Sequence, residues 1–161
     1  MYTELKDYFE NIARSHVEIQ HTDQEYHFFR IDAEEYLTKI NTSVNYPFLS
    51  LESYDSNFNA SSNDNVAITR QIAFMLVDSY KQGDYDAINE IYDRMEQVAL
   101  DIINKINEDQ KANIKLVRDF SYNSVNIQSL PPNPVHKYTG VRVTMSFDSK
   151  YNTAYNPEKW K

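Results

Sequence analysis

The most regular pattern of apolar and polar positions follows the segment Lys81-Gln-Gly83. Apolar side chains recur there at intervals of three and four, from Ile88 to Ile106. This spacing places them on one broad stripe of a helix, and Asp84 can cap its first free N–H groups. We therefore predict a helix over about 84–109 that lies on a sheet. A helix that binds a partner is the alternative.

Alternation with a period of two predicts strands on both sides of this helix. It is cleanest over 138–147, where Val141, Val143, Met145 and Phe147 should share one face. Residues 66–80 also alternate, although Arg70 interrupts them and their spacing also suits a helix. Their β-branched residues favour a strand. Further strands are expected over 25–31, 47–54 and 114–128.

The rest of the chain supplies shorter elements and connections. Residues 2–17 have an amphipathic pattern typical of a helix, and Asp32 can cap a short helix that ends near residue 40. The polar segment 55–65 is expected to be a long loop. Leu130-Pro-Pro-Asn-Pro134 should end the strand before it, because proline cannot donate to a strand ladder.

Together these elements predict an α+β fold. A mostly antiparallel sheet of about four to six strands would be covered by the long helix and the N-terminal helix. Residues 1–150 would form this single domain, and residues 151–161 a polar C-terminal tail.

Composition narrows the classes of function. The 161 residues include 2 Gly and no Cys, so disulfides and thiolate chemistry are excluded, and the glycine-rich loops that hold phosphates are not expected. The net charge of −8 disfavours sequence-specific binding of nucleic acid. We expect no secretion signal, because residues 1–20 carry charges throughout, and no membrane span, because no stretch approaches the roughly 18 apolar residues that a span needs.

Candidate catalytic and metal-binding residues are sparse. His21 and His27 flank two acidic residues, but the many acids of this chain make such proximity common. We expect no metal, no cofactor and no catalytic site. The weakest alternative is a small-molecule enzyme with a pocket beside the long helix that uses His27 or Glu35.

The order of elements and three segments carry a family resemblance. The segments are Phe74-Met-Leu-Val77, Asp84-Tyr-Asp86 and the strand from Tyr138 to Phe147. The chain resembles the tail-terminator and neck proteins of long-tailed bacteriophages and prophages. The resemblance implies a non-enzymatic virion assembly protein, with no cofactor. Its subunits would form a ring, expected to be a hexamer, at the end of the tail tube and help to join it to the head.

The same resemblance implies partners, a location and contact residues. The partners would be further copies of the chain, the tail-tube protein and the head-completion proteins. The location would be the cytoplasm of the bacterial host during assembly, and then the virion. Segment 55–65 would form contacts in the ring. The expected interaction residues are Asn57, Phe58, Asn59, Asn63, Asp64, Arg70, Tyr138 and Arg142.

A different class of function stays open at this point. The chain contains 13 tyrosines, and exposed tyrosines are common on contact surfaces. The alternative is a monomeric protein-binding adaptor domain with a tyrosine-rich sheet face. Its contact residues would be Tyr122, Tyr138 and Tyr151.

Overall fold

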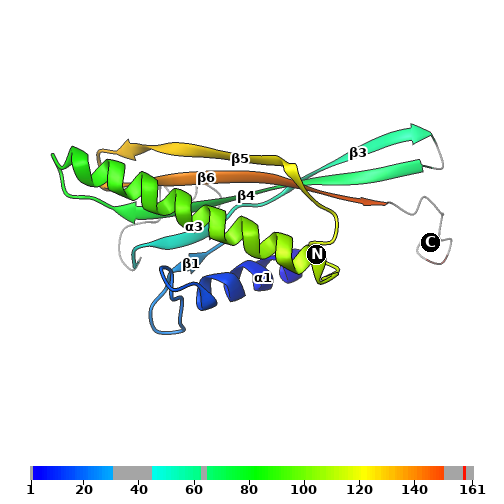
Figure 1. Cartoon of the computed structure of the whole chain (residues 1–161), viewed down its shortest axis with the longest axis horizontal. Helices are drawn as coiled ribbons and strands as arrows, with labels where there is room; N and C mark the ends of the chain where they lie inside the picture. The colour runs from blue at the N-terminus through cyan, green and yellow to red at the C-terminus, as the bar shows by residue number, and fades with distance from the viewer. Residues whose placement is uncertain (1, 31–44, 63–64, 151–157, 159–161) are drawn as a thin grey trace.

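A computed structural model describes residues 2–30, 45–62, 65–150 and 158 of the chain. Over these residues it confirms the α+β prediction, with two helices and a mostly antiparallel sheet of six strands (Figure 1). The elements are α1 (Tyr2–Ser15), β1 (Phe28–Phe29), β2 (Phe48–Leu51), β3 (Asp55–Ser62), β4 (Asn65–Ser79), α3 (Tyr85–Lys111), β5 (Phe120–Asn133) and β6 (Tyr138–Lys150).

The long strand β4 organises the sheet, whose order is β1-β2-β4-β6-β5. Along one edge of β4, β2 pairs with residues 74–77 and β3 pairs with residues 65–71. Along its other edge, β6 pairs from Ala67–Lys150 to Ser79–Tyr138 without a register shift. Only the short β1–β2 pair is parallel. Segment 66–80 is therefore a strand, as its β-branched content predicted.

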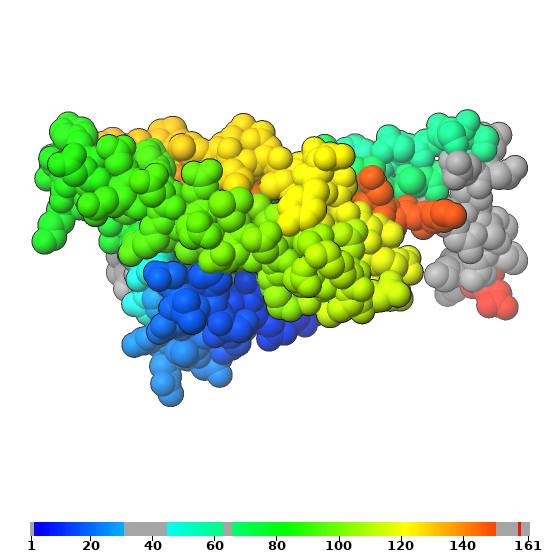
Figure 2. All heavy atoms as spheres, in the orientation of Figure 1, coloured from blue at the N-terminus to red at the C-terminus, as the bar shows by residue number. Residues whose placement is uncertain are grey.

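The main core lies between the sheet and the two helices. On the helix side of the sheet, residues of β4 and β6 face the apolar stripe of α3, and α1 covers the neighbouring part of the same face (Figures 1 and 2). The four residues predicted to share one face of β6 are all buried there. The Asp84 side chain accepts a hydrogen bond from Ala87 N–H at 3.0 Å, so it caps α3 as expected. Gly83 in the preceding turn has φ +84°, a conformation that favours glycine.

A smaller cluster lies on the opposite face of the sheet. It consists of Phe48, Met75, Val77 and Tyr138, all buried. The helix expected after Asp32 and most of the tail 151–161 lie outside the described residues.

The structure corrects the polar segment 55–65, because Asp55–Ser62 form the strand β3 and not a loop. The segment has little apolar alternation of its own. The N–H and C=O groups of its backbone find hydrogen-bond partners on the long strand β4, with which it pairs from Asp55–Gln71 to Ser62–Asn65. A polar sequence can therefore form a strand where a neighbouring strand offers an unpaired edge.

The end of β5 is a second correction. The expected break at Leu130-Pro-Pro-Asn-Pro134 does not occur, because β5 continues through Pro131 and Pro132 to Asn133. β5 is an edge strand, and its register with β6 shifts between Leu130 and Asn133, so the prolines need not donate to the ladder. The strand also starts at Phe120, six residues later than predicted. Elsewhere, β1 is limited to Phe28–Phe29, and α1 ends at Ser15 instead of residue 17.

Candidate functional site

A three-stranded arm projects from the part of the sheet that the helices cover (Figure 1). We define the arm as β3, residues 65–70 of β4 and residues 148–150 of β6, which are held together by cross-strand pairing. All eight residues of β3 are exposed. The arm therefore places a polar strand at the outer boundary of the molecule.

One face of the arm carries a short row of apolar side chains, here called the apolar strip. It consists of Phe58, Ala60, Val66 and Ile68. Phe58 is the cross-strand partner of Ile68 and Ala60 that of Val66, so all four lie on the same face. That face is continuous with the one that buries Ile72 beneath the helices. Phe58 is 63% exposed, so the apolar surface continues beyond the helices that cover the rest of it.

The opposite face of the arm is polar and internally hydrogen-bonded. The Asn59 Nδ2 group donates to Thr69 Oγ1 at 2.7 Å, and Thr69 Oγ1 donates to Asp148 Oδ1 at 2.6 Å. These two bonds connect all three strands of the arm. Asn57 lies on the same face as Asn59, two residues away along β3.

Arg70 occupies the strand position that the sequence left ambiguous. It is the partner of Ser56 and of Phe147, and its Nη1 donates to Ser149 Oγ at 2.6 Å. The guanidinium therefore lies on the face of the apolar strip, near the end that joins the helix-covered part of the molecule, here called the body. This placement fixes the register around Arg70.

Contacts with α1 hold the start of the arm against the body. Tyr54, directly before β3, stacks on Tyr2 with ring centroids 4.0 Å apart, and Tyr2 Oη donates to the Tyr54 carbonyl at 3.0 Å. The Arg30 guanidinium lies 4.9 Å from the centroid of the Tyr2 ring on its face. The direction of the arm is thus defined by aromatic contacts as well as by strand pairing.

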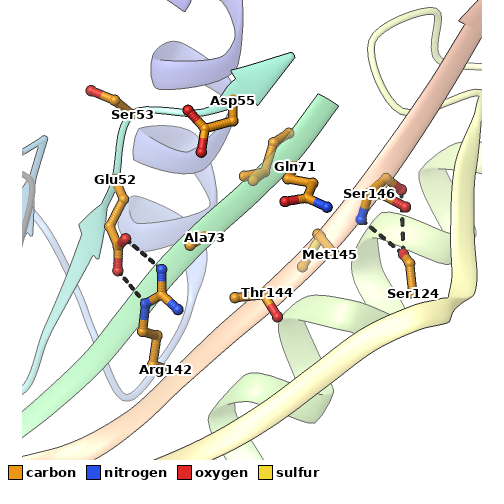
Figure 3. A pocket seen from close by; sticks show the side chains of 11 residues that line it. Glu52, Ser53, Asp55, Gln71, Ala73, Ser124, Arg142, Thr144, Met145 and Ser146 are labelled. Atoms are coloured by element: carbon orange, nitrogen blue, oxygen red, sulfur yellow. Dashed lines mark hydrogen bonds and ion pairs between the residues drawn. The ribbon is translucent and has the colours of Figure 1, made fainter. Parts of the chain in front are cut away.

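A polar hollow of ≈ 320 Å³ lies where the arm meets the helix-free face of the sheet (Figure 3). Glu52 and Arg142 point toward each other across it, and Arg142 donates through Nε and Nη2 to the two Glu52 oxygens at 2.7 Å each. This hydrogen-bonded pair raises the pKa of Arg142. On the other side of the hollow, Ser146 N–H donates to Ser124 Oγ at 2.8 Å. The described lining contains carboxylates, hydroxyls and one guanidinium, which suits ion pairing and hydrogen bonding.

A second hollow of ≈ 470 Å³ lies at the other end of the sheet, beside the start of α3 and the end of β5. Its lining includes Tyr80, Tyr85, Tyr92 and two prolines of the segment after Leu130. We call it the tyrosine hollow. In contrast to the first hollow, its described lining is mainly aromatic and aliphatic.

The structure brings together only part of the predicted interaction set. Asn57, Phe58, Asn59 and Arg70 all lie on the arm, whereas Asn63 and Asp64 lie outside the described residues. The other two predicted residues lie on β6, outside the arm. Arg142 is paired with Glu52, and the 7% exposed Tyr138 accepts a hydrogen bond from Asn133 Nδ2 at 3.2 Å. Burial raises the pKa of Tyr138.

The tyrosine contact face expected for an adaptor is not assembled over the described residues. Tyr138 is buried, and Tyr151 lies outside those residues. Tyr122 is 47% exposed, but its hydroxyl donates to Asn104 Oδ1 of α3 at 3.0 Å. Among the described tyrosines Tyr85 is the most exposed, at 78%, and it was not one of the expected contact residues.

The histidines near the N-terminus form structural contacts. His21 Nδ1 accepts from His27 N–H at 3.1 Å, and His27 Nδ1 lies 2.6 Å from the Pro47 carbonyl. Burial lowers the pKa of His21, and the nearby charge of Arg14 lowers it further. Among the residues that the structure describes, no group of three His, Asp or Glu side chains is arranged to hold a metal ion. Glu35, the other residue of the enzyme alternative, lies outside that part of the chain.

Sequence reasoning missed two features of these sites. It did not assign the half-buried Val66 and Ile68 to the apolar strip, and it did not find the tyrosine hollow. A signal for the strip was present, because the apolar alternation of β4 begins at Val66, well before the first residue that the helices bury, Ile72. No local pattern identifies the hollow, because it joins two distant parts of the chain, residues 80–92 and 132–137.

Comparison with known proteins adds no relative. No family model matches the chain, and searches of curated proteins and of solved structures find no significant match. Within the described residues, none of the helices combines the length and the apolar character needed to cross a membrane.

Proposed function

We propose that this protein is a non-enzymatic virion assembly protein, a tail-terminator-like subunit. Its copies form a ring, with a hexamer as the expected form, that caps the tail tube and helps to join it to the head. The phage assignment rests on the sequence resemblance. The self-assembly rests on the arm, which is the single structural observation that supports it most.

The arm supports self-assembly because it has the features of a contact element. Its apolar strip continues the core face of β4 beyond the helices, and exposed apolar surface of this kind often marks an interaction site. Its outer strand β3 contains no lysine and no proline, the residues that commonly protect edge strands from pairing. The net charge of −8 also suits a ring through which DNA passes without adhering.

The first test is native mass spectrometry over a concentration series, at low and at physiological salt. We expect the wild-type chain to form a closed oligomer of defined mass. The matched variant replaces residues 57–69 by Asn-Gly, which joins the cross-strand partners Ser56 and Arg70 through a two-residue turn. It should remain monomeric, because the arm is lost while the helix-covered sheet is kept.

Unfolding of the variant in urea is the control for its fold. A cooperative transition close to that of the wild type shows that the body is intact, whereas loss of the transition means that the arm is part of the folding unit. A variant that still assembles would contradict the role of the arm. A wild-type chain that remains monomeric, alone and when mixed with purified tail tubes, would overturn the proposed function and favour the adaptor alternative.

A further inference from the structure

The tyrosine hollow is built to present aromatic surface. Tyr80 Oη donates to the Asn133 carbonyl at 3.0 Å, and Tyr92 Oη donates to the Leu130 carbonyl at 2.8 Å. These bonds tie both hydroxyls to the end of β5. Tyr85, the third aromatic residue of the lining, is 78% exposed, and Val135 beside the hollow is 75% exposed. Exposed aromatic residues around a concave surface are typical of binding sites.

The hollow and the arm lie at opposite ends of the long axis of the molecule. In Figure 1 the start of α3 and the end of β5 are at the left, and β3 reaches the far right. One end is therefore concave and aromatic, and the other end is a projecting element with Phe58 on its surface. Every copy of the chain carries both.

We propose that the arm of one copy docks, through its apolar strip, in the tyrosine hollow of a second copy. This inference rests on the proposed function and names the two surfaces that would meet. The contact uses a different surface on each copy, so it is heterologous and can repeat from copy to copy until a ring closes. Phe58 of one copy and Tyr85 of the next would be the central aromatic contacts.

The charge of the two surfaces favours this pairing. The four residues of the apolar strip are uncharged, with Arg70 on the same face at the end nearest the helices, and the tyrosine hollow is lined by two charged residues, Asp84 and Lys137. A quarter of all residues in the chain are charged, at 25%, so both surfaces are poor in charge. The centres of protein interfaces show the same depletion, because few charges then have to lose water.

The size of the two surfaces also fits a contact between copies. The arm offers the eight residues of β3 with their neighbours on β4 and β6, and the hollow is lined by eleven residues. A standard interface uses roughly 20 to 30 residues from each side. Arm and hollow can thus form the centre of such an interface, and the surfaces around them its rim.

Cross-linking tests the pairing directly, because the chain contains no cysteine of its own. Ala60→Cys places a thiol on the apolar strip, and Asn89→Cys places one in the hollow lining, so both central aromatic residues are kept. We expect an equimolar mixture of the two variants to form a disulfide dimer that contains one copy of each. A mixture of Ala60→Cys with Asn11→Cys, an exposed position on α1, should form none.

A second experiment uses substitutions that introduce a charge. Adding Phe58→Asp to the Ala60→Cys chain should abolish the mixed dimer. Asn57→Asp, which adds the same charge to the opposite face of β3, should leave it unchanged. In native mass spectrometry Phe58→Asp and Tyr85→Asp should each be monomeric, and their mixture should stop at a dimer, because only one intact pair of surfaces remains.

The outcomes separate this inference from the proposed function. If Phe58→Asp abolishes assembly but Tyr85→Asp does not, and the mixed disulfide is absent, the arm docks elsewhere: the inference is overturned and the assembly function stands. If the wild-type chain does not assemble and the mixture of Ala60→Cys with Asn89→Cys forms no mixed disulfide, both are overturned. A mixed disulfide, together with a mixture of Phe58→Asp and Tyr85→Asp that stops at a dimer, supports both the inference and the assembly function.

Discussion

Gly140 of β6 is the cross-strand partner of Val77 in β4 and leaves no room for a side chain. A Cβ atom at this position would lie 2.9 Å from Val77 Cα and still closer to the Leu76 carbonyl oxygen. Both contacts are with the backbone of β4, which cannot move without disturbing the ladder. We predict that Gly140→Ala lowers the free energy of unfolding by roughly 3 kcal/mol, the upper part of the range for overpacking a core. Urea denaturation measures it.

Gly83 is the matched control for that substitution. No atom lies within 4 Å of a Cβ built there, and only the φ of +84° opposes a side chain. Gly83→Ala should therefore cost about 1 kcal/mol. Equal losses for the two variants would mean that the close approach of the strands at Gly140 is not what requires glycine.

His21 makes stability depend on pH. Its side chain is buried, with Nε2 3.7 Å from Glu10 Oε1, and burial lowers its pKa below the ordinary value of 6.5. The unfolded chain then binds more protons than the folded chain between that lowered pKa and about 6.5. Stability should fall on acidification through this window, by at most about 1.4 kcal/mol per pH unit. Urea denaturation at pH 7, 6 and 5 measures it.

His21→Gln separates this effect from that of the neighbouring acid. The variant should lose the slope just below pH 6.5. Hydrogen bonds from Arg14 and Lys6 lower the pKa of Glu10 below its ordinary 4.5, so the stability that Glu10 contributes is lost only at more acidic pH. If the slope between pH 6.5 and 5 persists in His21→Gln, another group is responsible for it.

Among the elements, α1 and α3 are joined by a hydrogen bond in the partly buried layer between them. Tyr8 Oη donates to Asp109 Oδ2 at 2.8 Å, and Lys105 Nζ donates to Asp109 Oδ1 at 2.5 Å. Asp109 is 7% exposed. We predict that Tyr8→Phe costs about 1 to 2 kcal/mol, because it removes one donor from a buried carboxylate. Thermal or urea unfolding tests this.

Tyr122→Phe is the control at the element scale. Its hydroxyl also bonds to a side chain of α3, but the residue is 47% exposed, so water can replace it as donor to Asn104. The expected cost is below about 0.5 kcal/mol. A larger effect for Tyr122→Phe than for Tyr8→Phe would contradict the importance of burial at the α1–α3 contact.

Helices and strands with one buried face could be predicted from the sequence, whereas those without one could not. The positions of α3 and β6 were predictable because one face of each is buried, and burial imposes a period of 3.6 or 2 on the apolar residues. β3 was not, because its hydrogen bonds come from the excess length of β4 and neither of its faces is buried. The strand break predicted from the prolines of β5 was wrong for a related reason. Whether a proline ends a strand depends on whether that strand lies at the edge of the sheet.

The candidate site was also predictable only in part. Asn57, Phe58 and Asn59 were predicted from an unusual stretch of polar sequence, and they lie together on the arm. The tyrosine hollow was not predictable, because it depends on how the end of β5 meets the start of α3. Arg142 was not predictable as half of an ion pair, since Glu52 is ninety residues away along the chain.

At the scale of the whole molecule, the arm makes the chain longer than a compact domain. A compact domain of 161 residues has a radius of gyration of about 15 Å. We predict a larger value for Phe58→Asp, which keeps the arm but should not associate. The variant with residues 57–69 replaced by Asn-Gly should approach the compact value. Small-angle X-ray scattering at low concentration measures both, and equal radii would show that the arm folds back.

β2 and β3 both pair with the same edge of β4, while β6 follows its other edge from the arm into the core. Arm and body therefore share two continuous strands, with no hinge between them. A pull along the arm axis would load the β4–β6 hydrogen bonds side by side, in shear, so many would have to break at once. A sideways pull would open them one after another. The arm should thus be mechanically strong along its length and weak across it, which the proposed contact between neighbouring subunits would require.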